Sequence, residues 1–211
     1  MKNNPTHYYR AQCGEDRWIE QNFTKLGLPS LGTFVEYGAG DGEEFSNTYW
    51  LEHVRGWNGL LAEPDPRHVI AGRPRSKIER LAVGPMRTLR MGLTVDPFLS
   101  GAARVGMPKH SPIHERLNVV EEIDVEQVPL SDLLVKHGIE QLDVLSIDTE
   151  GTELESWRTL DLNRWKPRLL IIEHDTWALR NDKSTLLAEL AKDGYLLVHE
   201  TIFNFLMVPS T

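Results

Sequence analysis

The sequence predicts an α/β protein: a mostly parallel sheet with helices on both faces and an antiparallel strand hairpin at its C-terminal end. First, residues 33–51 have the pattern of a short apolar strand, a glycine-rich turn and a helix, the opening unit of nucleotide-binding α/β folds. Second, apolar runs that end in polar or acidic residues recur at 58–65, 142–148 and 168–174. Third, two closely connected strands are expected at 195–199 and 202–208. We therefore expect one domain over residues 1–211.

The composition excludes several classes of protein. A formal net charge of −8 argues against a broad nucleic-acid-binding surface. Cys13 is the sole cysteine, so no disulfide can form within the chain and a reducing compartment is favoured. No apolar run approaches the length of a membrane span, and the first residues do not have the pattern of a secretory signal. We expect a cytoplasmic protein, whose oligomeric state the sequence leaves open.

The glycine-rich turn at residues 38–42 predicts a ligand that lies against bare main chain. The dinucleotide fingerprint G-x-G-x-x-G would need its third glycine at Glu43, and Gly42 comes one residue too early. The turn and its flanks are also acidic, which would repel the pyrophosphate of NAD. S-adenosylmethionine (SAM) has no phosphate and carries a sulfonium and an ammonium group, so the acidic turn favours SAM.

Two further positions are candidates for cofactor contact. Glu63 closes the predicted strand at 58–65 and follows the glycine turn by roughly the twenty residues expected of a ribose-binding acid. A carboxylate there can accept hydrogen bonds from two ribose hydroxyls. Ala82 lies near the end of a third strand predicted at 76–83, where contact with an adenine and ordinary core packing are both compatible with its small side chain.

A candidate catalytic group lies at the ends of two later strands. Asp148 ends a buried strand, Glu150 follows in a tight turn, and His174 ends the next strand. Open α/β sheets place their chemistry at the carboxyl ends of their strands, so these side chains are expected to face one cavity. Any of the three can serve as a general base. A divalent cation, Mg²⁺ or Mn²⁺, held by the same three residues and polarising the acceptor is the alternative.

Two segments flank this core. A helix is predicted over residues 8–26, because Trp18, Ile19, Phe23 and Leu26 recur at helical spacing and Gly27 can end it. Residues 87–116 are broken by prolines and glycines and are locally basic. A loop of that length is either a lid over the acceptor or a solvated mobile loop. If it is a lid, its basic residues favour an anionic acceptor.

Several stretches carry a family likeness when taken together. They are QCGEDRWI at 12–19, FVEYGAGDG at 34–42 with SNT at 46–48 and LE at 51–52, GWNGLLAEP at 56–64, and LSIDTEGTEL at 145–154; Asn204 also fits. In combination the chain resembles the FkbM family of SAM-dependent methyltransferases. Ala11 stands where the family often has serine, and residues 86–122 match nothing in it, which leaves the acceptor open.

The resemblance implies a class I methyltransferase, Rossmann-like fold and O-methylation of a hydroxyl group on a small-molecule acceptor, a sugar or a natural product. Carried over by position, the residues that would hold SAM are Glu36, Gly38, Gly40, Asn47 and Glu63, with Asp148 at the methyl-transfer face. An N- or carboxyl-methyltransferase stays open as an alternative. A non-catalytic SAM-fold module that binds a partner is a second rival, and the acidic residues at successive strand ends argue against it.

Overall fold

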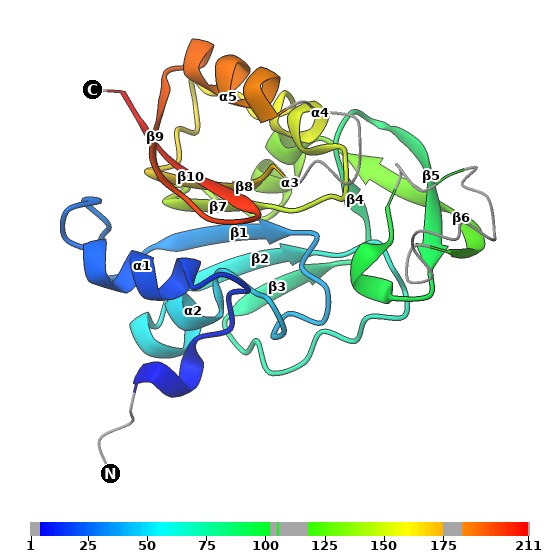
Figure 1. The fold of residues 1–211 in the computed structure, drawn as a ribbon, viewed down its shortest axis with the longest axis horizontal. Helices are drawn as coiled ribbons and strands as arrows, with labels where there is room; N and C mark the ends of the chain where they lie inside the picture. The colour runs from blue at the N-terminus through cyan, green and yellow to red at the C-terminus, as the bar shows by residue number, and fades with distance from the viewer. Residues whose placement is uncertain (1–4, 102–104, 106–117, 175–182, 211) are drawn as a thin grey trace.

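The computed structural model describes residues 5–101, 105, 118–174 and 183–210. Within them, a seven-stranded sheet has the order β3-β2-β1-β7-β8-β10-β9 (Figure 1). Its strands are β1 (Thr33–Tyr37), β2 (Asn58–Ala62), β3 (Ser76–Glu79), β7 (Val144–Ile147), β8 (Leu169–Glu173), β9 (Tyr195–Glu200) and β10 (Asn204–Pro209). All pairs from β3 to β8 are parallel, and β10 is antiparallel to both β8 and β9. The expected sheet and its C-terminal hairpin are confirmed.

Helices cover both faces of this sheet, with α1 and α2 on one side and α3, α4 and α5 on the other (Figure 1). The helices are α1 (Glu15–Asn22), α2 (Tyr49–Arg55), α3 (Leu130–Lys136), α4 (Glu153–Trp157) and α5 (Lys183–Lys192), with 3-10 turns η1 (Pro5–Tyr8) and η2 (Pro97–Leu99). Successive strand residues point to opposite faces. In β1, Phe34 therefore packs in the core beside α1 and α2, and Val35 packs in the core beside α3 to α5.

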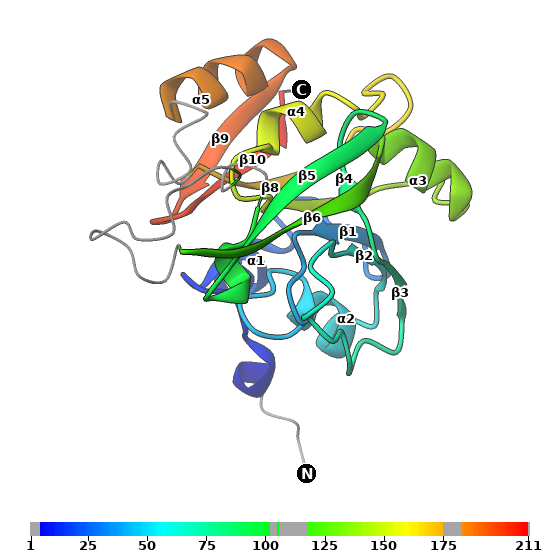
Figure 2. The same ribbon diagram turned by 90° about the vertical axis from the view of Figure 1, so that its right-hand side faces the viewer.

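A second, three-stranded sheet lies beside the carboxyl ends of β1 and β2 (Figures 1 and 2). Its order is β4-β6-β5, formed by β4 (Ala82–Val83), β5 (Arg87–Thr94) and β6 (Val119–Val128). The prediction of a single strand over residues 76–83 is therefore wrong, because this segment is divided between the two sheets. Ser76–Glu79 pairs with β2, whereas Ala82–Val83 pairs with β6. The chain changes sheets at Arg80 and Leu81, a step that leaves no mark on the sequence pattern.

The prediction of an irregular loop from residue 87 is wrong for its first part, because Arg87–Thr94 form the strand β5. This strand pairs with β6 over Arg87–Thr94. Leu89, Met91 and Leu93 alternate with polar residues along most of it, which is the periodicity of a half-buried strand. After η2, residues 102–104 and 106–116 lie outside the described residues, so a lid over the acceptor stays a prediction.

The N-terminal helix is shorter than the predicted 8–26. It begins at Glu15 after Gly14, whose φ of 82° lies in the left-handed region, and its regular part ends at Asn22. The Asp16 carboxylate accepts hydrogen bonds from the backbone N–H groups of Arg10 and Ala11, at 2.6 and 3.0 Å. Those two residues cannot continue a helix while their N–H groups are used in this way. We call residues 10–14 the N-terminal strap.

Helix α2, the helix expected within residues 33–51, does not begin directly after the glycine-rich turn. The Asp41 carboxylate accepts the backbone N–H groups of Glu43 and Glu44, both at 2.8 Å, and Phe45 has a φ of 64°. These contacts hold residues 41–45 as a turn, and the helix starts at Tyr49. No helix among the described residues is long and apolar enough to cross a membrane.

Candidate functional site

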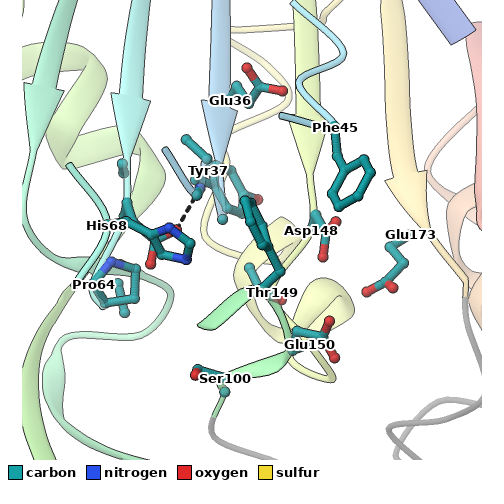
Figure 3. Close-up of a pocket in the computed structure, with 18 of the residues that line it drawn as sticks. Glu36, Tyr37, Phe45, Pro64, His68, Ser100, Asp148, Thr149, Glu150 and Glu173 are labelled. Atoms are coloured by element: carbon teal, nitrogen blue, oxygen red, sulfur yellow. Dashed lines mark hydrogen bonds between the residues drawn. The ribbon is translucent and has the colours of Figure 1, made fainter. Parts of the chain in front are cut away.

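A cavity of about 820 Å³ opens at the carboxyl ends of the central strands, facing the second sheet. Its wall includes the ends of β1, β2, β7 and β8, part of β4 and β5, and residues 96–101. Figure 3 shows Pro64 and His68 on one side of it and Asp148, Glu150 and Glu173 on the other. Every residue expected to contact a cofactor lines this cavity: Glu36, Gly38, Gly40, Asn47, Glu63, Ala82 and Asp148.

The glycine turn needs its glycines for two physical reasons. Gly38 and Gly40 have φ values of 71° and 54°, which side-chain-bearing residues rarely adopt. A Cβ on Gly38 would lie 1.4 Å from the backbone oxygen of Asp148, and one on Gly40 would lie 2.6 Å from the ring of Phe98. The first clash is with main chain that cannot give way. Gly38 is thus required for the turn to pack against the end of β7, and Gly40 lets Phe98 approach the turn.

Glu36 lines the cavity, but its carboxylate is occupied by the protein. It accepts hydrogen bonds from Ser46 Oγ at 2.7 Å, from the backbone N–H of Asn47 at 2.8 Å and from Thr48 Oγ1 at 2.5 Å. These three contacts fix the turn that leads into α2. Glu36 therefore acts on a bound molecule mainly through Asn47, whose position it sets.

Asn47 presents an unused acceptor. Its Nδ2 donates to Ser146 Oγ at 3.1 Å, while Oδ1 is buried and has no hydrogen-bond partner among the described residues. The residue is only 7 % exposed. A buried acceptor left without a donor is costly, so an N–H donor on a bound molecule is the natural partner for it.

Glu63 joins the end of β2 to the glycine turn. Oε2 accepts the backbone N–H of Gly40 and Oε1 accepts that of Asp65, both at 2.8 Å. Burial raises the pKa of Glu63 to about 7, an effect that the two backbone hydrogen bonds oppose and the charges of Asp65 and Asp148 reinforce. Each oxygen keeps a second lone pair for a ligand hydroxyl.

Three carboxyl groups gather at the opposite side of the cavity. Asp148, Glu150 and Glu173 each have an oxygen within 4.8 Å of the others. Burial is the main cause that raises the pKa of Glu173 well above its ordinary value, followed by the charges of Asp148, Glu150 and Glu153 and a hydrogen bond with the Asp148 side chain. Two carboxyl groups joined in this way share a proton. The three oxygens are also the ligand type that Mg²⁺ or Mn²⁺ prefers.

His174 does not join this group, so its expected place among the catalytic or metal-binding residues is not supported. Its ring packs against Phe205 at 4.2 Å between centroids, and Nε2 lies 3.2 Å from the backbone oxygen of Thr201. His174 is absent from the cavity wall, where Glu173 stands instead. Because neighbouring residues at a strand end point to opposite sides, choosing His174 rather than Glu173 placed the wrong side chain in the cavity. A signal for Glu173 was present in the sequence, because β1, β2 and β7 also have an acidic residue near their carboxyl ends.

Sequence reasoning also missed the aromatic and apolar part of the wall. Phe98 of η2 packs against His68 at 4.7 Å and against Phe45 at 5.3 Å, and Met91 of β5 lines the same side. Phe203, at the turn between β9 and β10, also faces the cavity. These residues come from segments far apart in sequence, and only the packing of the second sheet beside the first brings them together.

The turn at Glu150 is held by Glu153, the first residue of α4. Thr152 and Glu155 have the spacing of a capping box, but Thr152 makes no side-chain hydrogen bond at the start of α4. Glu153 orders the turn instead, because its Oε1 accepts the backbone N–H groups of Thr149 and Gly151 at 3.2 and 2.8 Å. Glu150 is held at a φ of 53° in this turn, with its side chain on the cavity wall.

The cavity thus combines the Glu63 carboxyl group bound to the glycine turn on one side, a carboxyl pair on the other, and apolar residues on its wall. A family model described as the methyltransferase FkbM domain matches residues 36–197. No curated protein and no solved structure matches the chain. The matched residues include both acidic sides of the cavity.

Proposed function

Since the chain belongs to the FkbM methyltransferase family, we propose that it methylates a hydroxyl oxygen of a small molecule, a sugar or a natural product, with SAM as the methyl donor. The observation that carries the proposal is the pairing, in one cavity, of the Glu63-bound glycine turn with the Asp148–Glu173 carboxyl pair. The first suits a nucleoside and the second suits removal of a proton.

The residues of the cavity fit SAM. The unpartnered Oδ1 of Asn47 suits an ammonium group, and the carboxylate-rich wall suits a positive charge. Glu63 would take the ribose hydroxyls, and Ala82 lies on the wall where an adenine can pack. When bound, SAM supplies a methyl group on a sulfonium, which a nucleophilic oxygen displaces in line.

The protein then has to align the acceptor oxygen with the methyl group and to remove the proton of the acceptor hydroxyl. Residues of β5 and η2 form the wall of the cavity opposite the strand ends. Asp148 is the proposed general base, since it lies on the cavity wall and shares a hydrogen bond with Glu173. Burial raises the pKa of Glu173, and its hydrogen bond with the Asp148 side chain orients Asp148 in the cavity. A divalent cation held by Asp148, Glu150 and Glu173 is the alternative, and it would polarise the acceptor hydroxyl.

The charge of the cavity favours neutral or cationic acceptors. Seven acidic residues line it, and no lysine or arginine is found among the lining residues that the structure describes: the acids are Glu36, Glu44, Glu63, Asp96, Asp148, Glu150 and Glu173. This acidic wall does not support the anionic acceptor that the basic residues of segment 87–116 suggested. An amine is the second candidate acceptor, because a carboxylate-rich wall binds an ammonium group.

The test combines binding and turnover. Calorimetry should show S-adenosylhomocysteine binding to the wild type and its loss in Gly40→Val, whose side chain would displace Phe98. Incubation with SAM and a panel of glycosides, polyols and amines should then release S-adenosylhomocysteine with one class of acceptor, and mass spectrometry of the product gives the methylated atom. Tight binding of NADH without binding of S-adenosylhomocysteine would sink the proposal, and methylation of nitrogen alone would replace the hydroxyl acceptor by the amine.

A further inference from the structure

The N-terminal strap (residues 10–14) runs along the mouth of the cavity. Ala11 forms an isolated parallel bridge with Phe45, which follows the glycine turn and lines the cavity. Gln12 follows Ala11 directly, and it lines the cavity together with Phe45, Ser46 and Asn47. It belongs to a part of the chain that precedes the matched family domain.

Glu15 fixes the strap from its other end. The side chain is fully buried, at 0 % exposure. Oε2 accepts the backbone N–H of Cys13 at 2.9 Å, and Oε1 accepts hydrogen bonds from Thr201 Oγ1 at 2.7 Å and Asn204 Nδ2 at 3.0 Å. A buried carboxylate is tolerated only when it is well hydrogen-bonded. Here one oxygen binds the strap and the other binds the β9–β10 hairpin, so Glu15 ties the two together. The strap is therefore held at both ends.

Gln12 is the strap residue whose side chain is left for a ligand. It lines the cavity and is exposed, and its amide has no hydrogen-bond partner among the described residues. Most of the other lining residues have acidic, apolar or hydroxyl side chains. Its amide thus adds an N–H donor to a wall dominated by acceptors.

A carboxylate bound in this cavity would need such a donor. Among the described lining residues, side-chain N–H donors are Gln12, Asn47 and His68. Asn47 Nδ2 is already used by Ser146, and His68 lies beside Pro64 on the Glu63 side (Figure 3). The sheet order β2-β1-β7-β8-β10 puts the strap, which is tied to β10, at the other side. A ligand with its ribose at Glu63 would extend its far end towards Gln12.

We propose that Gln12 binds the amino-acid end of SAM, its amide Nε2 donating to the carboxylate while Asn47 Oδ1 accepts from the ammonium group. Glu15 is the positioning residue that holds Gln12 there. This inference rests on the proposed function, because it names how the same cavity recognises its cofactor. It predicts that contacts at the strap discriminate between nucleosides with and without the amino-acid group.

The experiment compares two nucleosides by calorimetry, S-adenosylhomocysteine and 5′-methylthioadenosine, which lacks the amino-acid group. Gln12→Ala should weaken S-adenosylhomocysteine binding roughly tenfold, the effect of one hydrogen bond to a charged group, and leave 5′-methylthioadenosine binding unchanged. Gln12→Glu, of the same shape, should weaken S-adenosylhomocysteine further because like charges repel. Glu15→Gln should show the same selective loss together with a lower melting temperature.

Gln21→Glu is the matched control, since Gln21 is an exposed residue of α1 and the substitution makes the same change of charge. It should alter the binding of neither nucleoside. Equal weakening of both nucleosides in Gln12→Ala, or weakening of neither while the wild type binds both, would overturn this inference and leave the proposed function standing. A wild type that binds neither nucleoside would overturn the proposed function and this inference with it.

Discussion

The Glu63 carboxylate accepts a hydrogen bond from the backbone N–H of Gly40 at 2.8 Å, so the acid that follows β2 is bound directly to the glycine turn that follows β1. Both oxygens of Glu63 are engaged with main chain on the cavity wall. The residue expected to bind ribose is therefore also a structural part of the turn. Its substitution should change pH dependence and stability as well as affinity.

Glu63 should make the stability of the ligand-free protein fall as the pH rises. Its pKa is raised to about 7 in the folded protein, from 4.5, so the folded state holds a proton that the unfolded state has released between these values. The stabilisation is complete below the unfolded pKa and is lost as pH rises through about 7. Between about pH 5 and pH 8, the free energy of unfolding should drop by up to about 3 kcal/mol more in the wild type than in Glu63→Gln, measured by urea denaturation. Parallel pH profiles for the two proteins would contradict the raised pKa.

Gly38 should tolerate no side chain, whereas a glycine of similar backbone conformation elsewhere should. Gly38→Ala adds a Cβ 1.4 Å from the backbone oxygen of Asp148 and should cost at least about 3 kcal/mol of unfolding free energy. Gly72 has a φ of 72° and open space around its Cβ position. Gly72→Ala should therefore lower the free energy of unfolding only by the cost of a left-handed backbone conformation, about 1–2 kcal/mol. Denaturant titration of both variants separates the clash from the backbone conformation, and equal losses would refute the close packing of the turn on β7.

Turnover should depend on Asp148 and not on His174. Asp148→Asn removes the proposed base and should lower turnover about a hundredfold or more while S-adenosylhomocysteine still binds. His174→Ala removes a ring that packs on Phe205 outside the cavity, so turnover should stay within a few fold of the wild type. Steady-state rates with the acceptor found in the panel, and calorimetry on each variant, give both quantities. A large loss in His174→Ala with a near-normal rate in Asp148→Asn would reverse the assignment.

Chelation should leave turnover unchanged. The side chains of Asp148 and Glu173 are joined by a hydrogen bond, which a cation bound between them would have to replace. Rates measured in EDTA should therefore equal those in buffer containing Mg²⁺ or Mn²⁺. Loss of activity in EDTA and recovery on adding Mg²⁺ or Mn²⁺ would assign Asp148, Glu150 and Glu173 to a bound metal instead.

The local sequence pattern is sufficient to predict the central sheet and most of the cofactor side of the cavity. Glycines at 38 and 40 and the acids Glu36, Glu63 and Asp148 all follow or end buried apolar runs. In a parallel sheet such runs end at one edge, so local pattern alone predicts that these residues meet. That argument accounts for Glu36, Gly38, Gly40, Glu63 and Asp148 on the cavity wall, whereas Ala82 reaches it from the second sheet.

The surroundings of these groups depend on contacts between segments that are distant in sequence. Whether Glu173 or His174 faces the cavity depends on the side to which each points, which a single step along the strand reverses. Phe98 and Met91 reach the cavity because β4, β5 and β6 form a separate sheet beside the strand ends. Gln12 reaches its place because Glu15 bonds to Thr201 and Asn204, more than 180 residues away in sequence. Such contacts are set by packing between distant segments, which leaves no periodic mark on the chain, whereas strands and glycine turns are set by residues close to one another in it.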